Sequence, residues 1–406
     1  MAVFGLIFIS TVLFVYTLSS FKKRYLVSLF ICGLYLFSCI IGIMIALDKS
    51  NRVDFTLWPC IVFLLVFNLY LIPFMKKIPV IGGVNKKCIN RFIFIGYGIS
   101  AVLLIGDVLL ASKIQEVALV GFAEARVMGY NDDPTLTSFT TSQHIGHSIL
   151  RWFSGLSYLL VVMFFYSMVF IRKHTLFKII LIISSLSAGY YGLCGASRTR
   201  LMYWFLFFFM SYLIFGEYLT KKGKIAIRTA IIIFASIVVS AFVLISIVRS
   251  ELQGLEMDDF LTSYAGQPIV NFCTFIDGYE PPSYSVYRIL PLSSTLVSGR
   301  FDLVKYRDYV YAKTGFEING FNTMMGDFYI DTGLMGMFLV SFVFFLVAYR
   351  LMKEKTFGFN HLCLLTILLQ IPLFGVFYYS LWQMESSVCS IMTLLFGAFI
   401  MAPNKK

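Results

Sequence analysis

Residues 25–47 read YLVSLFICGLYLFSCIIGIMIAL, a run without a single charged side chain. About 20 consecutive apolar residues are enough to cross a bilayer as an α-helix. Further runs of this kind follow along the whole chain, at 2–20, 56–74, 92–112, 153–171, 178–196, 201–219, 229–247, 334–350, 360–381 and 386–402. Together these runs predict an all-α polytopic membrane protein with about eleven transmembrane helices.

The composition excludes an ordinary soluble domain. Of the 406 residues, 59% are hydrophobic and 13% are charged, whereas soluble domains carry about 25% charged residues. No positive charge precedes the run at 2–20, so we expect a retained helix and not a cleaved signal peptide. The eight cysteines form no CxxC pair, and we therefore expect neither a disulfide framework nor a zinc site, and no cofactor. No nucleic-acid partner is expected.

Basic residues are concentrated in alternate loops, which predicts the orientation of the chain, because such loops face the cytoplasm. Twenty of the 33 Lys and Arg residues fall in loops of one set: Lys22, Lys23, Arg24, Lys76, Lys77, Lys86, Lys87, Arg91, Arg172, Lys173, Lys178, Lys221, Lys222, Lys224, Arg228, Arg350, Lys353, Lys355, Lys405 and Lys406. This pattern places the N-terminus outside and the C-terminus in the cytoplasm.

Two external segments are long, and they divide the chain. We expect helices 1–4 in residues 1–112, an external loop at 113–152 and helices 5–8 in 153–247. A second external loop at 248–333 is predicted to be partly helical, and helices 9–11 occupy 334–406. A loop of that second length is usually functional.

External arginines are the first candidates for chemistry. Arg198 and Arg200 lie in the short turn Gly195-Ala-Ser-Arg-Thr-Arg, and Arg249, Arg288 and Arg300 lie in the second loop. Arginine binds phosphate oxygens with two parallel hydrogen bonds and stays charged. These five residues are therefore candidates for binding a pyrophosphate. The alternative for Arg198 and Arg200 is that they anchor helix ends at the membrane surface, and for the other three it is a solvated loop of mixed charge.

Carboxylates are the second group. Asp327 and Asp331 lie four residues apart in the run Asn319-Gly-Phe-Asn-Thr-Met-Met-Gly-Asp-Phe-Tyr-Ile-Asp-Thr-Gly333, so they share one face if the run is helical. Either can act as a general base when burial raises its proton affinity. The alternative is a pair of solvated acids at a helix start. Asp107, inside a predicted span, is a further candidate, and an external arginine is its expected partner.

Histidines and tyrosines complete the candidate site. His144 and His147 lie in the first external loop and are too few for a metal site, so we expect no bound metal. His147 is a candidate base and His144 a candidate sugar contact. The second loop is rich in tyrosine, whose flat ring and hydroxyl suit sugar binding but also suit a membrane interface. We take Tyr284, Tyr287 and Asn322 as candidate sugar contacts.

The Ser-Arg turn at 195–200, the arginine-containing loop and the G-D-F-Y-x-D-x-G-x-x-G run entering the next helix resemble bacterial O-antigen polymerases of the Wzy type. The resemblance implies a multi-pass protein of the bacterial inner membrane. It would polymerise undecaprenyl-pyrophosphate-linked repeat units at the periplasmic face without a metal, with a chain-length regulator and a flippase as partners. Two alternatives stay open: an O-antigen ligase that transfers glycan to lipid A-core, and a lipid-linked oligosaccharide flippase or transporter.

Overall fold

The computed structural model describes the chain except residues 49–52, 84–85, 122–123, 126–137, 172, 196, 198, 254–256, 281–285, 299–302, 315–321 and 403–406. In residues 86, 237–239, 241–253, 257–264, 297–298, 303–304 and 313–314 only the backbone is described. The described part is mostly helical and includes one pair of two-residue strands, β1 (Val80–Ile81) and β2 (Thr356–Phe357). The prediction of an all-α protein is confirmed to this extent.

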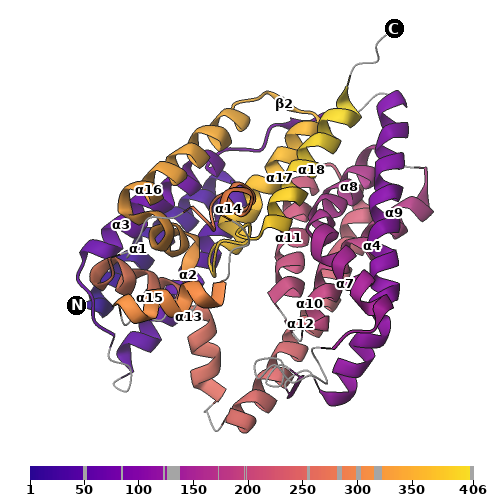
Figure 1. The fold of residues 1–406 in the computed structure, drawn as a ribbon. Coiled ribbons are helices and arrows are strands. Elements are labelled where there is room, and N and C mark those ends of the chain that lie inside the picture. Colours follow the sequence, from indigo (N-terminus) through magenta and orange to yellow (C-terminus); the bar gives the residue numbers. More distant parts are fainter. Residues whose placement is uncertain are drawn as a thin grey trace. The chain divides into compact units, whose positions relative to one another are not determined.

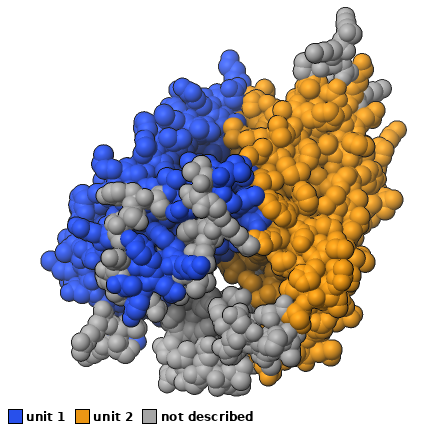
Figure 2. Space-filling view, in the orientation of Figure 1, with its two compact units in different colours: residues 1–80, 258–355, 367–387 blue, residues 81–257, 356–366, 388–406 orange. Residues whose placement is uncertain are grey.

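The chain divides into two compact units, which we describe one at a time (Figure 2). Unit 1 comprises Met1–Val80, Asp258–Lys355 and Ile367–Ser387. Unit 2 comprises Ile81–Met257, Thr356–Thr366 and Val388–Lys406. Each unit therefore combines segments that lie far apart in the sequence.

Unit 1 contains α1 (Ala2–Lys23), α2 (Leu26–Leu47), α3 (Trp58–Leu71) with the short helix η1 (Ile72–Phe74), α13 (Met257–Gly278), α14 (Pro291–Ser298), α15 (Leu303–Thr314) and α16 (Thr323–Leu351) (Figure 1). Helices α1 and α2 form a hairpin because Arg24 takes a left-handed conformation (φ 56°) that ends α1. A core of apolar side chains joins α2 to α3, where Tyr35 packs on Phe63 and Phe67.

Unit 2 contains α4 (Lys86–Val120), α7 (Thr141–Phe153), η2 (Ser154–Leu156), α8 (Ser157–Phe170), α9 (Thr175–Ser185), α10 (Ser187–Cys194), α11 (Thr199–Phe215), α12 (Lys221–Gln253) and most of α18 (Met384–Met401), whose first turn belongs to unit 1. The long helix α4 packs against α7, α9 and α10. Close approach of α4 and α7 depends on Gly106 and Gly146, since a methyl group on Gly146 would lie 2.7 Å from Leu109. Helix α17 (Phe359–Phe374) begins in unit 2 and ends in unit 1.

Within the described residues, seven helices are long and apolar enough to cross a membrane. They are Ala2–Lys23, Leu26–Leu47, Lys87–Val120, Thr141–Phe170, Thr175–Cys194, Thr323–Leu351 and Met384–Met401. Three predicted spans correspond to shorter apolar helices, Trp58–Phe74, Thr199–Phe215 and Phe359–Phe374. The span predicted at 229–247 lies in α12, where the side chains of 237–239 and of 241–253 are not described. The structure thus supports a membrane protein, and the count of eleven stays a prediction.

Several helices extend into segments that we expected to be loops. Helix α4 continues to Val120, α7 begins at Thr141, and α16 begins at Thr323 instead of residue 334. In α16 the polar residues that suggested a loop are buried against other parts of unit 1. The second long loop, predicted to be partly helical, contains α13, α14 and α15.

Candidate functional site

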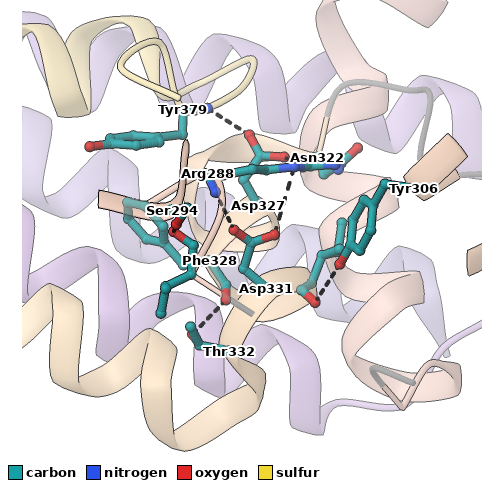
Figure 3. A network of polar contacts seen from close by, with 11 residues as sticks. Arg288, Ser294, Tyr306, Asn322, Asp327, Phe328, Asp331, Thr332 and Tyr379 are labelled. Atoms are coloured by element: carbon teal, nitrogen blue, oxygen red, sulfur yellow. Dashed lines mark hydrogen bonds and ion pairs between the residues drawn. The ribbon is translucent and has the colours of Figure 1, made fainter. Parts of the chain in front are cut away.

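A buried ion-paired cluster in unit 1 joins Arg288 to Asp327 and Asp331 (Figure 3). The Arg288 side chain donates to Oδ1 of Asp327, and its Nε lies 3.8 Å from Oδ1 of Asp331. The backbone amide of Arg288 also donates to Oδ2 of Asp331 at 2.7 Å. The exposed fractions of the three residues are 6%, 4% and 0%. The structure therefore brings together one predicted arginine and both predicted carboxylates.

Helix α16 places the two carboxylates on one face, as their spacing of four predicts. Its first amides are satisfied by the turn after α17: the amides of Asn322 and Thr323 donate to the carbonyl of Phe377. The amide of Tyr379, in the same turn, donates to Oδ2 of Asp327 at 2.7 Å (Figure 3). Asp327 is thus held from two directions, by Arg288 and by the turn.

Asn322 and three tyrosines surround the charged groups. Asn322 is buried, and its side-chain amide lies 3.4 Å from Oδ1 of Asp327. The ring of Tyr306, on α15, lies 5.9 Å from the Arg288 guanidinium. The hydroxyl of Tyr329 donates to the carbonyl of Tyr279. The cluster therefore has aromatic walls and a polar centre.

Three buried polar atoms of this cluster have no hydrogen-bond partner in the described part of the chain: Nε of Arg288, Oδ1 of Asp331 and Oδ1 of Asn322. Buried polar atoms are nearly always paired, so unpaired ones indicate a place where a ligand can bind. One is a donor and two are acceptors. A sugar, whose hydroxyls both donate and accept, matches such a set.

The charge balance of the cluster is one arginine against two carboxylates. Burial by itself lowers the pKa of the Arg288 guanidinium, but the carboxylates of Asp327 and Asp331 outweigh it and hold that pKa above its ordinary value. Arg288 is therefore fully charged and already paired. A pyrophosphate would therefore have to compete with the two carboxylates for this guanidinium.

A second group of predicted residues lies in unit 2. The hydroxyl of Tyr191, on α10, is 3.1 Å from Nε2 of His147, on α7. The guanidinium of Arg200 lies over the Tyr191 ring at 4.5 Å and donates to the hydroxyl of Ser154 at 3.1 Å. Among the residues that the structure describes, Arg200 has no ion pair with a carboxylate. This arginine is held in place, and no carboxylate in the described part of the chain compensates its charge, as suits an anion-binding residue.

The two histidines lie on a helix and not in a loop, contrary to our expectation. Helix α7 begins at Thr141, before the span predicted from residue 153, because Thr140 and Gln143 form a capping box. In this motif each side chain accepts a hydrogen bond from the other residue's backbone amide. The ring of Phe139 packs against both His144 and His147, at 5.3 and 5.0 Å. The helix thus turns both histidines toward one aromatic side chain.

Other buried polar groups of unit 2 lie on α4. Asp107 accepts a hydrogen bond from Ser187, so its described partner is a serine and not the arginine that we expected. Lys113 is 1% exposed and is bonded to Glu116 and to the carbonyl of Ser138. Polar groups inside an apolar helix are costly and are usually functional.

The remaining predicted site residues are less defined. Arg198, Arg300 and Tyr284 lie outside the described residues. Arg249 lies on α12, and only the backbone of this residue is described. Tyr287 is half-buried and adjoins Arg288 in the sequence. The structure thus sorts the candidates into a unit 1 group and a unit 2 group.

Sequence reasoning missed Tyr379, Tyr191 and Ser154, which contact the candidates. Tyr191 and Ser154 lie inside predicted apolar runs and carry no signal of their own. Tyr379 lies in the polar and aromatic stretch Phe377-Tyr-Tyr-Ser-Leu-Trp-Gln383, which is unusual for the end of a membrane span. Within the described ranges no three or more His, Cys, Asp or Glu residues are grouped as a metal site would require.

The chain matches no family model, no curated protein and no solved structure.

Proposed function

We propose that the chain is a membrane glycosyltransferase that polymerises undecaprenyl-pyrophosphate-linked repeat units at the periplasmic face of a bacterial inner membrane. The observation that carries the proposal is the buried cluster of Arg288, Asp327 and Asp331 at the start of an apolar helix. Ionisable residues inside membrane helices are rare and usually belong to a functional site. The resemblance of the run 319–336 to Wzy-type polymerases supports the same assignment.

The reaction requires a hydroxyl of the acceptor sugar to attack the anomeric carbon of the donor. The bond from that carbon to the pyrophosphate oxygen breaks, the pyrophosphate leaves with the electron pair, and the hydroxyl proton passes to a base. Asp331 suits the base, because its Oδ1 is buried and has no hydrogen-bond donor among the described residues. Asp327, which accepts from Arg288 and Tyr379, suits a positioning role.

The leaving pyrophosphate gains charge as the bond breaks, and arginines can stabilise it without a metal. Arg200 supports this part of the proposal, since Ser154 and Tyr191 hold its guanidinium and no described carboxylate neutralises it. His147 is a second candidate base, bonded to Tyr191. Aromatic rings beside both groups suit the apolar faces of sugars.

The test is polymerisation by the purified chain in lipid nanodiscs, with an undecaprenyl-pyrophosphate-linked repeat unit as both donor and acceptor. We expect a ladder of longer glycans, which persists with excess EDTA and is lost in Asp331→Asn. Loss of the ladder in EDTA with recovery on adding magnesium or manganese would contradict the metal-independent mechanism.

Two other functions share some of these features. A ligase would use the same donor with lipid A-core as acceptor, so the same assay with that acceptor separates the two. A flippase is favoured by Asp107 and Lys113 inside the apolar helix α4, since transporters place polar groups there. Movement of the lipid-linked oligosaccharide across a proteoliposome membrane, without any change in glycan length, would replace the glycosyltransferase proposal with the flippase.

A further inference from the structure

Helices α3 and α13 of unit 1 pack side by side and run in opposite directions. At one end of the contact, the amide of Thr56, just before α3, donates to Oδ2 of Asp277 at 3.1 Å. Further along, the rings of Phe63 and Phe272 meet with their centroids 5.6 Å apart. Residue numbers rise along α3 while they fall along α13, so the residues between these two contacts also face each other.

Two cysteines occupy the facing positions between these contacts. Cys60 lies on α3 and Cys273 on α13, and both side chains are fully buried. The neighbouring Cys39 is engaged elsewhere, because its thiol donates to the carbonyl of Leu6 at 3.2 Å. All eight cysteines are free thiols in this structure.

Close packing around Cys60 restricts the positions that its sulfur can take. Helix α1 passes so close that a methyl group on Gly5 would lie 2.5 Å from the Cys60 sulfur. Glycine is therefore needed at this position to make room for the thiol. The register of α3 against α13 thus places the two cysteines at facing positions, and facing placement is a requirement of a disulfide.

We propose that Cys60 and Cys273 are a redox pair that forms a disulfide between α3 and α13. In the balanced step, the Cys60 thiolate attacks one sulfur of a small-molecule or protein disulfide and releases one thiol. The Cys273 sulfur then attacks the mixed disulfide and releases the second thiol, so two electrons and two protons pass to the oxidant. The pair lies near the start of α3, which our topology places at the external, oxidising side.

The bond would fasten the part of unit 1 that leads to the charged cluster. Asp277 and Tyr279 lie just beyond Cys273 at the end of α13, and the carbonyl of Tyr279 accepts from Tyr329 of α16. A covalent link at Cys273 therefore fixes the start of the segment that carries Arg288. This inference stands on the register of α3 against α13 and on the burial of the two cysteines, and it does not depend on the proposed activity.

The test uses the full chain, purified in detergent and incubated either with dithiothreitol or with the permeant oxidant dithiodipyridine. Each sample is then unfolded, alkylated with a maleimide and analysed by intact mass spectrometry. We expect all eight cysteines to be labelled after reduction and two fewer after oxidation, with reversal by dithiothreitol. Digestion of the oxidised sample without reduction is expected to yield one linked peptide that joins Cys60 to Cys273.

Variants separate this pair from its neighbours. Cys39→Ser is expected to retain the two-label difference, whereas Cys60→Ser and Cys273→Ser each abolish it. The equally buried Cys32 and Cys363 should stay labelled in both states of the wild-type chain. Full labelling after oxidation, or a linked peptide that joins any other two cysteines, overturns the proposal. Peptide mapping is done on the wild-type chain, so the result does not depend on whether a variant folds.

Discussion

The backbone amide of Arg288 donates to Oδ2 of Asp331 at 2.7 Å, so one carboxylate on α16 fixes the backbone position of the arginine. The Arg288 side chain then extends to Asp327, one helical turn earlier. Each member of the cluster is thus positioned by another member. Because the contacts are buried, removal of Arg288 leaves two carboxylates without a cation, whereas removal of one carboxylate leaves Arg288 paired with the other. This difference determines how variants should behave.

Replacement of Arg288 should damage both stability and activity. Arg288→Ala leaves two buried carboxylates without their cation, and loss of one partner of a buried pair typically costs about 3–5 kcal/mol. Arg288→Lys keeps the charge but loses the planar fork that reaches both acids, so we expect it to fail nearly as badly. The measurements are thermal unfolding in detergent and the polymerisation assay, with the exposed Lys305→Ala as control. Normal unfolding and normal glycan ladders in both variants would show that Arg288 is a simple anchor.

The two carboxylates should differ from each other. Asp331→Asn keeps an oxygen that accepts from the Arg288 amide, so we expect a folded protein whose polymerisation rate falls by about 10²–10⁴, the range for loss of a general base. In Asp327→Asn one of the two oxygens that accept from Arg288 and Tyr379 becomes an NH2 group that cannot accept, so its main effect should be a lower thermal midpoint. Wild-type turnover in Asp331→Asn would place the base elsewhere, with His147 next in line.

In unit 2, Arg200→Lys should be more harmful than Tyr191→Phe. Lysine cannot combine the flat stacking on Tyr191 with the bond to Ser154, and loss of a positioned charge at a leaving group costs about 10²–10³ in rate. Tyr191→Phe keeps the ring beneath Arg200 and removes only the contact with His147, so we expect a change of a few-fold. Equal rates for the two variants would mean that Arg200 does not contact the leaving group.

Gly333 should tolerate no side chain. It interrupts α16 with φ 67° and ψ −173°, a conformation that is essentially restricted to glycine and costs about 1–3 kcal/mol for other residues. Gly333→Ala should therefore lower the thermal midpoint of unfolding. The matched control is Gly98→Ala within α4, where a methyl group meets no atom within 4 Å and alanine favours a helix. An unchanged midpoint in Gly333→Ala would mean that the helix can continue straight through this position.

Topology is tested by reporter fusions at Lys222, which lies in a basic segment predicted to face the cytoplasm. Green fluorescent protein fused there should fluoresce, and alkaline phosphatase fused there should be inactive. A fusion at Thr141, predicted to lie outside, should show the reverse. A dark fluorescent fusion at Lys222 together with active phosphatase would invert the whole orientation.

The sequence predicted helices well where a run was uniformly apolar, and less well where polar residues were buried. Residues 323–332, which include Asp327 and Asp331, fall in the predicted loop at 248–333, yet they form the first turns of α16. Their carboxylates are compensated by Arg288 and by the amide of Tyr379, both distant in the sequence. A sequence pattern describes only residues that are close along the chain. It therefore cannot show that a distant arginine compensates the charge of a buried carboxylate.

The start of α7 was different, because its signal was present in the sequence. Thr140 and Gln143 have the spacing of a capping box, but apolar periodicity pointed to a start at residue 153. The pairing of Arg200 with Tyr191 had no such signal. It depends on how α10 and α11 fold back on each other, where Gly192 allows close approach to Arg200.

The turn that follows α17 has a consequence for hydrogen exchange. Backbone carbonyls of this turn accept hydrogen bonds from the amides of Asn322, Thr323 and Met324. The amide of Tyr379, in the same turn, donates to Asp327. These four amide protons are therefore protected from solvent deuterium by a single local structure. A ligand that draws Asp327 away from Tyr379 favours opening of the turn. By thermodynamic linkage, opening of the turn strengthens the binding of that ligand by the same factor.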